Sequence, residues 1–330
     1  MSTITNKLFP DFKSQHIMMV HPYMYVNKDY FIELVNIYKN LNKIFLDNSV
    51  SQTIVLDQNS VLSDYYIGSQ ESDIRTIYYN CDDVWIRDFM PKLYICGHEK
   101  KRIDYQFNAY GEKYPHNRDK DFKNVISISK GNIELNDFVL EGGNLEFSSK
   151  GIITNIHAIH KNNIKKNINI EHKLSDLRES LEVEELLFIC IPGIMGDDTN
   201  GHIDNLVRYI DENTIVYFAS KDKKYCNYKI AYELEKQIDS LISRSKSITN
   251  AFPIYHNSND VLSTGSKVLP YSKLNFILTK NILVIPCINS NKDSIYSDLD
   301  RIHIKNKTYV LNSEATLFEY GGLHCLTANI

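Results

Sequence analysis

The sequence lacks the features of a membrane protein, a secreted protein or a nucleic-acid-binding protein. No window approaches the ~20 apolar residues that a membrane span needs, and residues 1–15 lack the basic and apolar regions of a signal peptide. Net charge is −4, and the one basic run, at 161–166, is short and rich in Asn. We therefore expect a cytoplasmic globular protein that binds neither membrane nor nucleic acid.

The cysteines also lack a pattern. Their spacing is irregular and contains no CxxC pair, and a chain of 330 residues does not need disulfides to hold its core. This favours free thiols in a reducing compartment. The six positions are Cys81, Cys96, Cys190, Cys226, Cys287 and Cys325.

The order of apolar segments predicts one α/β domain over residues 1–330. No linker rich in Pro, Gly or Ser divides the chain. Apolar side chains at helical spacing predict helices over 28–46 and 229–242. Apolar runs between them predict strands, the pair at 276–278 and 282–285 as a hairpin. The predicted strands are 53–56, 77–79, 138–140, 151–154, 186–191, 214–219, 276–278, 282–285 and 309–311.

The segment around Cys325 is the most informative in the chain. A Gly pair precedes the thiol, and glycine allows a close approach of backbone to ligand. A lone cysteine is a candidate nucleophile when His and carboxylates stand elsewhere in the sequence. Three further motifs supply them: Trp85-Ile86-Arg87-Asp88, Glu141-Gly142-Gly143-Asn144 and Asn200-Gly201-His202-Ile203-Asp204-Asn205.

The spacing of these motifs indicates a repeat. Asp88, Glu141, Asp204 and Cys325 are 53, 63 and 121 residues apart, and the last interval is about twice the others. Units of about 60 residues that each end at one shared axis would give about five units. One unit would then end near residue 264, and the polar residues that follow, Tyr271, Lys273 and Asn275, are weaker candidates for the pocket.

The charges of the motif residues predict a cationic ligand. His202 and Asp204 stand at i and i+2, so in an extended segment both would face one pocket, and Glu141 could orient the imidazole. Two carboxylates fit the donors of a planar guanidinium, whose central carbon would lie within reach of a thiolate. A metal is the alternative, but a thiol with hard carboxylates is a mixed ligand set. We predict neither metal nor cofactor.

Each residue taken singly also has a structural explanation. Asp88 could pair with Arg87, Glu141 could belong to a turn, and His202 and Cys325 could be buried core residues. His324 would point away from the site if the segment were a strand. Only the four motifs together favour a catalytic site.

The four motifs resemble those of the agmatine deiminase family, the bacterial-type peptidylarginine deiminase group of the guanidine-modifying superfamily. The resemblance runs from about residue 75 onward, with Thr199–Asn205 and Gly321–Thr327 as its most specific parts. It implies the pentein fold, a five-bladed α/β propeller of ββαβ units with pseudo-fivefold symmetry. It also implies a hydrolase acting on C–N bonds of linear amidines.

The resemblance assigns a role to each motif residue. Cys325 would attack the guanidinium carbon to form an amidino-thioether, and Asp88 and Asp204 would bind the guanidinium nitrogens. His202, held by Glu141, would protonate the departing ammonia and then activate water. The cationic substrate and the protonated imidazole would favour the thiolate. Further substrate contacts would come from Glu141, from Trp85, as a wall, and from Asn144.

The substrate is less defined than the reaction. Phe89-Met90 replaces the Thr-Gly of the agmatine deiminase pattern, and His21-Pro22 is the nearest match to its Trp-Pro element. Agmatine, giving N-carbamoylputrescine and ammonia, is the first expectation, with putrescine and polyamine synthesis as its setting. Alternatives are arginine or a peptide-terminal arginine giving citrulline, a methylarginine hydrolase or amidinotransferase, and a non-catalytic pentein binding protein. A homodimer is a family-level expectation.

Overall fold

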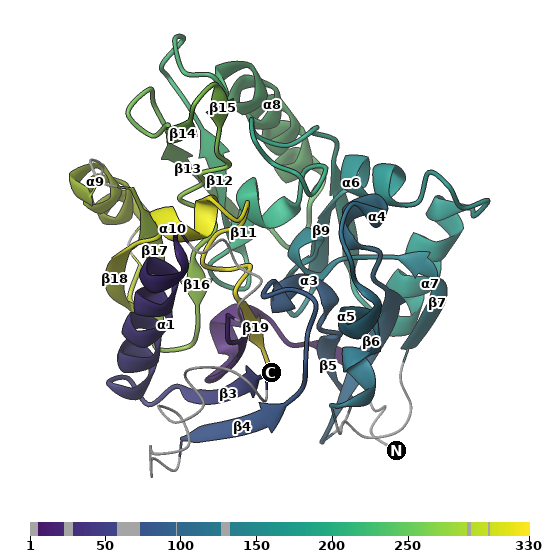
Figure 1. The fold of residues 1–330 in the computed structure, drawn as a ribbon. Coiled ribbons are helices and arrows are strands. Elements are labelled where there is room, and N and C mark those ends of the chain that lie inside the picture. Colours follow the sequence, from purple (N-terminus) through teal and green to yellow (C-terminus); the bar gives the residue numbers. More distant parts are fainter. Residues whose placement is uncertain are drawn as a thin grey trace.

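The computed structural model describes residues 6–22, 29–57, 73–96, 98–126, 133–288, 292–302 and 304–330. Within these ranges the strands form five sheets of three or four strands and one two-stranded ribbon. The sheets are separate in hydrogen bonding, and three of them are each built from one continuous stretch of the chain (Figure 1). The α/β composition expected from the sequence is confirmed.

The same order of strands recurs in each of the five sheets. In one of them β11 (Val207–Tyr209) is antiparallel to β12 (Thr214–Ala219), which is parallel to β13 (Asn250–Tyr255). A parallel pair needs a crossover, and α8 (Tyr228–Arg244) provides it here. The sheet of β8, β9 and β10 and the sheet of β16, β17 and β18 repeat this pattern.

The remaining elements complete these units. One sheet is formed by β8 (Glu146–Phe147), β9 (Gly151–Asn155) and β10 (Glu185–Ile189), and α6 (Ile156–Asn162) and α7 (Ile170–Leu181) connect β9 to β10. The third has β16 (Ile277–Leu278), β17 (Ile282–Cys287), α9 (Lys292–Ile302) and β18 (Lys307–Asn312). The fourth has β1 (Asn6–Leu8), β5 (Lys92–Cys96), β6 (Glu99–Gln106), α4 (Ala109–Glu112), α5 (Asn117–Asp121) and β7 (Ile133–Val139).

The fifth sheet joins segments from opposite ends of the sequence. It contains β2 (His16–Val20), β3 (Ser51–Leu56), β4 (Ile74–Tyr78) and β19 (Thr327–Asn329). The register places Thr327 opposite Met19 and Ala328 opposite Met18. Consequently the segment that carries Cys325 is anchored by pairing with a strand from the start of the chain.

Burial of one apolar stripe explains the two long helices. α1 (Phe31–Leu46) buries Leu34, Tyr38, Leu41 and Phe45 at spacings of three and four. α8 does the same with Ala231, Leu234, Ile238 and Leu241 at its core-facing side, against β12 and its neighbours.

The predicted elements agree well with the structure. Both predicted helices are present, although α1 begins at Phe31 and residue 28 lies outside the described residues. Each predicted strand overlaps an observed one, and the predicted hairpin is the antiparallel pair β16–β17. All six cysteines are free. In the described ranges, no helix has both the length and the apolar character needed to cross a membrane.

Candidate active site

The predicted site residues lie on the short segments that connect one sheet to the next. Asp88 lies on α3 (Ile86–Phe89), between β4 and β5. Glu141 caps the 3-10 helix η3 (Gly142–Asn144), and His202 caps η4 (Ile203–Asn205). Cys325 lies two residues before the start of β19, and its carbonyl accepts a hydrogen bond from the Arg87 amide at 3.3 Å. The connections thus bring distant motifs to one place.

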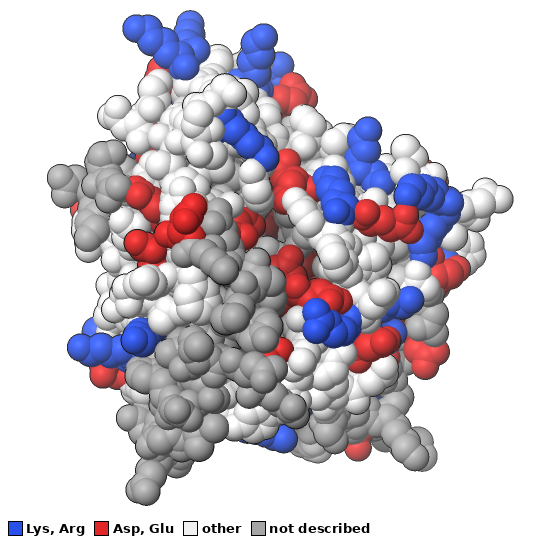
Figure 2. All heavy atoms as spheres, viewed as in Figure 1, with Lys and Arg blue, Asp and Glu red and all other residues white. Residues whose placement is uncertain are grey.

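A cavity of about 440 Å³ opens onto these segments. Asp88, Tyr110, Trp85 and Cys325 contribute to its lining, so Trp85 lies where the predicted wall would be. Figure 2 shows acidic side chains around a hollow in the middle of this face. The acidic residues that line the cavity are Asp82, Asp83, Asp88, Asp198 and Glu319.

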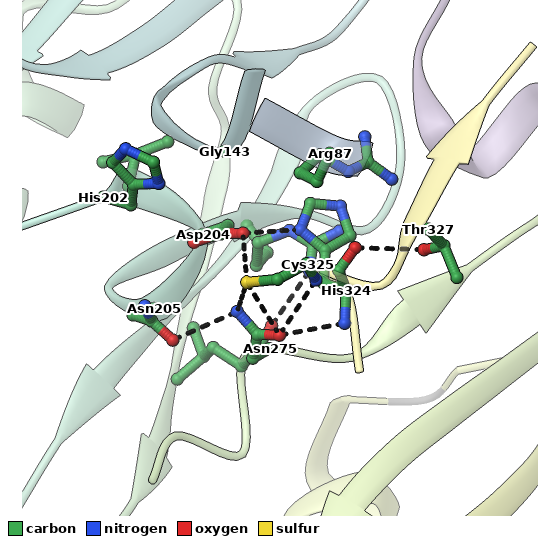
Figure 3. Close-up of polar contacts among 12 residues, drawn as sticks. Arg87, Gly143, His202, Asp204, Asn205, Asn275, His324, Cys325 and Thr327 are labelled. Atoms are coloured by element: carbon green, nitrogen blue, oxygen red, sulfur yellow. Dashed lines mark hydrogen bonds and ion pairs between the residues drawn. The ribbon is translucent and has the colours of Figure 1, made fainter. Parts of the chain in front are cut away.

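The Cys325 thiol is buried beside two polar side chains (Figure 3). Asn275 Nδ2 lies 3.3 Å from Sγ, and Asp204 Oδ2 lies 3.8 Å from Sγ. Burial raises the pKa of Cys325 well above its ordinary value, and the charges of Asp204 and Asp88 raise it further. The thiol is therefore protonated at neutral pH, and a bound cation would oppose that effect.

Asn275 is the weaker sequence candidate that proves central. Its Oδ1 accepts a hydrogen bond from the His324 amide at 2.9 Å, and its Nδ2 also donates to Asn205 Oδ1 at 3.1 Å. Gly322 packs so closely against Asn275 that a β-carbon there would collide with the amide. Lys273 instead lies buried, 3.1 Å from Asp260, and does not line the cavity.

His202 lies between two carboxylates. Its Nε2 is 2.7 Å from Glu141 Oε2, and its Nδ1 is 3.4 Å from Asp88 Oδ1. Burial alone would lower the pKa of His202, but Asp88, Glu141 and Asp204 together raise it to about 10. The imidazole is therefore protonated at neutral pH. In the described part of the chain, Nδ1 has no hydrogen-bond partner.

Asp88 is held from two directions. Its Oδ1 accepts a hydrogen bond from the Gly143 amide, and its Oδ2 accepts one from the Tyr110 hydroxyl, both at 2.9 Å. Burial raises the pKa of Asp88 to about 6, against the lowering effect of the protonated His202. The alternative that Asp88 pairs with Arg87 is wrong, because Arg87 turns to Asp11 and Asn329.

Tyr110 is a site residue that sequence reasoning missed. Besides its hydroxyl contact with Asp88, its amide donates to Glu141 Oε1 at 3.1 Å, and its ring lies 5.7 Å from that of His202. It stands in a left-handed turn over 109–112, with φ of 62° at Tyr110. Such conformations are costly for residues with a β-carbon and concentrate at functional sites. Only Gly111, in the middle of this turn, hints at it in the sequence.

Asp204 and His324 form a second contact that the sequence did not predict. Asp204 Oδ2 is 2.7 Å from His324 Nδ1, so His324 faces the site instead of pointing away. The strand assumed for His324 is absent, since β19 begins only at Thr327. The extended segment assumed for His202 and Asp204 is likewise the 3-10 helix η4.

Asn144 does not line the cavity. Its Oδ1 accepts from the amides of Asn155 and Ile203, both at 3.2 Å, and its Nδ2 donates to the Asn155 carbonyl at 3.0 Å. These bonds join η3 to η4, so Asn144 supports both segments; its predicted substrate contact stays a prediction. Among the described residues, no group of three or more potential ligands is arranged for a metal ion.

Residues 13–330 match the sequence profile of the Porphyromonas-type peptidyl-arginine deiminase family. The chain belongs to this family. Family relatives include agmatine deiminases of Ectopseudomonas mendocina and Pseudomonas putida, which are 24% and 25% identical. In both comparisons the match covers 78% of this chain and 77% of the relative.

Solved structures of the family share the fold. A substrate-bound Cys-to-Ser variant of C. jejuni agmatine deiminase gives a TM-score of 0.86 at 21% identity, covering 100% of this chain and 97% of that one. Agmatine deiminase of Enterococcus faecalis gives 0.82 at 18% identity, covering 98% and 95%. A dimethylarginine dimethylaminohydrolase structure gives 0.54 at 8% identity, covering 96% and 100%. These likenesses establish the mixed α/β fold.

Proposed function

We propose that the protein hydrolyses the guanidinium group of agmatine to give N-carbamoylputrescine and ammonia. The observation that carries this proposal is the meeting of one thiol with two carboxylates and a protonated imidazole in a buried pocket. Asp204 Oδ1 and His202 Nδ1 are both buried without a hydrogen-bond partner in the described ranges. A planar cation with several N–H donors would satisfy the carboxylate oxygen.

The first half of the proposed reaction forms a covalent intermediate. Asp88 and Asp204 hold the guanidinium, whose charge lowers the pKa of the Cys325 thiol so that the thiol loses its proton to solvent. The thiolate sulfur bonds to the guanidinium carbon, a C–N bond breaks, and His202 gives its proton to the departing nitrogen, which leaves as ammonia. The enzyme then carries an amidino-thioether on Cys325.

The second half of the proposed reaction restores the thiol. Neutral His202 takes a proton from water while the water oxygen bonds to the same carbon. The C–S bond then breaks, the ureido product leaves and Cys325 regains its proton. Overall, one water replaces one nitrogen, and no redox partner is required. Glu141 keeps the imidazole oriented through both halves.

The acidic mouth of the cavity favours agmatine over arginine. Asp83, Asp198 and Glu319 line it, and burial raises the pKa of Asp83 to about 7, with further contributions from Asp198 and Glu319. The cation among the lining residues, Arg118, is already paired with Asp82 at 2.6 Å. A second cation on the tail of the substrate is attracted here, whereas an α-carboxylate is repelled. The agmatine deiminase names of the relatives agree with this choice.

The proposal extends to the arrangement of the five sheets and to the oligomeric state. The five sheets with one strand order, joined by connections that meet at the site, support a five-bladed propeller of ββαβ units. A homodimer is proposed from the family resemblance alone, and sedimentation of the purified protein tests it. Arginine or peptide-terminal arginine, with citrulline as product, is the alternative activity, and a non-catalytic binding protein is the other.

Ammonia release from a panel of guanidines tests the proposed function. We expect agmatine to be turned over, arginine and arginine-ended peptides to react more slowly, and methylarginine to yield no methylamine. Cys325→Ser should lower kcat by about 10⁴-fold or more, while Cys190→Ser, at an exposed free cysteine, should leave it unchanged. Normal turnover by Cys325→Ser would refute the mechanism, and silence across the whole panel would favour the non-catalytic alternative.

A further inference from the structure

We propose that His324 and Asp11 position the Asp204 carboxylate for the substrate through a hydrogen-bonded chain from Asp11 to His324 to Asp204. This inference rests on the proposed function and adds two positioning residues to it. Neither residue lines the cavity, and Asp204 does not line it either, but Asp204 Oδ2 lies 3.8 Å from the sulfur of Cys325, which does. Their action on the substrate would pass through Asp204 alone.

The two oxygens of Asp204 have different surroundings. Oδ2 contacts His324 Nδ1 at 2.7 Å and lies 3.8 Å from the Cys325 sulfur (Figure 3). Oδ1 is buried without a hydrogen-bond partner in the described part of the chain. A carboxylate rotates freely about its last torsion unless one oxygen is held. His324 therefore determines which oxygen remains for the guanidinium.

His324 is held on every side. Its amide donates to Asn275 Oδ1 at 2.9 Å, and its carbonyl accepts from Thr327 Oγ1 at 3.1 Å. Its Nε2 lies 2.9 Å from Asp11 Oδ2, and the side chain is 1% exposed. The ring therefore has one orientation, with one carboxylate at each nitrogen.

The proton count of this chain sets its charge. Contacts of 2.7 and 2.9 Å between a ring nitrogen and a carboxylate oxygen each require a proton. With two protons the two carboxylates and the imidazole carry a net charge of −1; burial and the cations Arg208 and Arg87 act against the second proton by lowering the pKa of His324 to about 4.

Asp11 is itself anchored by cations from two other units. Arg87 Nη2 lies 3.1 Å from Asp11 Oδ2, and Arg208 Nη2 lies 3.6 Å from the same oxygen. Asp11 begins the 3-10 helix η1 (Asp11–Lys13), which is remote in sequence from the other site residues. The far end of the chain of hydrogen bonds is therefore fixed to the body of the molecule.

Two substitutions of His324 separate positioning from packing. The side-chain amide of Asn occupies the place of Nδ1 and still donates to Asp204, whereas that of Gln extends toward the place of Nε2 and Asp11. We expect His324→Gln to raise KM for agmatine by ~30-fold or more, as loss of a partner to a buried charge does. His324→Asn should stay within ~5-fold of wild type, as retention of one hydrogen-bond donor allows. His172→Asn, at an exposed histidine, is the control.

The outcomes distinguish this inference from the proposed function. Calorimetry in a Cys325→Ser background should show that His324→Gln weakens agmatine binding more than His324→Asn does. In the variants that keep Cys325, KM should change more than kcat. Equal losses in both His324 variants, or a smaller loss for Gln, would overturn the positioning role while wild-type turnover leaves the function intact. No turnover by wild type would overturn both. If His324→Gln does not fold, Asp11→Asn is measured instead. An unchanged KM in Asp11→Asn would refute the proposed hydrogen-bonded chain.

Discussion

Asp88 is a buried carboxylate whose ionised form is the one that binds a cation. Its pKa of about 6 lies above the ordinary value because burial disfavours the charged form. The competent form is therefore fully present above pH 7 and is lost as pH falls through 6. Because the Cys325 thiol must also lose its proton, we expect kcat/KM for agmatine to rise with pH above 6 and to fall by a further factor of about ten per pH unit below 6.

The loss of activity at low pH should be smaller in kcat than in kcat/KM. A bound guanidinium stabilises the ionised carboxylate and lowers its pKa, so kcat reports a lower value than kcat/KM. The measurement is a pair of profiles from pH 4.5 to 8 under saturating and limiting agmatine. His202, with a pKa of about 10, stays protonated throughout this range. A kcat/KM profile that is flat down to pH 5 would contradict this assignment.

Single residues were predicted with uneven success, for a physical reason. Motifs in the sequence marked Asp88, Glu141, His202, Asp204 and Cys325, because the chemistry limits which side chains serve there; their catalytic roles stay predictions. Contacts between residues of different units have no corresponding motif in the sequence. The bonds of Tyr110 to Asp88 and of His324 to Asp204 join residues 22 and 120 positions apart.

At the scale of elements, η3 packs directly against the side chains of Asp88 and His202. A β-carbon on Gly143 would lie 2.5 Å from Asp88 Oδ1 and 2.7 Å from His202 Nδ1. Both distances are too short for any carbon, so the two side chains must move. We expect Gly143→Ala to lower kcat/KM by ~100-fold, the effect of a displacement of about 1 Å at a catalytic group.

The control is a glycine that meets no neighbour. A β-carbon on Gly265, in the turn between β14 (Ser263–Thr264) and β15 (Lys267–Val268), has no atom within 4 Å. Gly265→Ala should leave steady-state kinetics unchanged. If Gly143→Ala matched wild type in kcat/KM, the close packing of η3 against the site would be of no catalytic consequence.

Helices and strands were easier to predict than the connections that carry the site. α8 and β12 follow from the period of their apolar residues, which is local information. η4 was expected to be extended, but its geometry depends on bonds from elsewhere. The Ile203 amide donates to Asn144 Oδ1 on η3 at 3.2 Å, and the His202 amide donates to Thr199 Oγ1 at 3.0 Å.

At the scale of the whole molecule, Arg208 joins several units through one buried side chain. It donates to Glu146 Oε1 on β8 at 2.5 Å and to the carbonyls of Leu274 and Phe276 at 2.9 and 2.8 Å. We expect Arg208→Met to lower the free energy of unfolding by ~3–5 kcal/mol, because Glu146 is left buried without its cation.

Denaturant unfolding monitored by fluorescence measures this loss. Arg244→Met, at an exposed position on α8, should cost under ~0.5 kcal/mol and serves as the control. The double variant Arg208→Met with Glu146→Met should recover part of the stability, since no unpaired charge remains. A cost for Arg208→Met no larger than that of the control would mean that Arg208 does not hold the units together.

The repeat inferred from motif spacing agrees with the presence of five sheets in the described residues, while their arrangement as a propeller stays a proposal. A missing site residue was expected after about residue 264, and Asn275 lies on the connection between the sheet of β13 and the sheet of β16. The spacing indicated where such a residue would stand but not that its amide would contact the sulfur. That contact depends on the turn of 321–325, which folds against another unit.

The pairing of β19 with β2 has a consequence for the newborn protein. Asp88, Glu141 and His202 all precede β18 in the sequence, so they are synthesised before the Cys325 nucleophile. Until β19 arrives, β2 is an edge strand with the apolar residues Ile17, Met18 and Met19, and such edges recruit other chains. Pairing of β19 with β2 therefore anchors the segment that carries the nucleophile and covers the open edge of β2 in the same step.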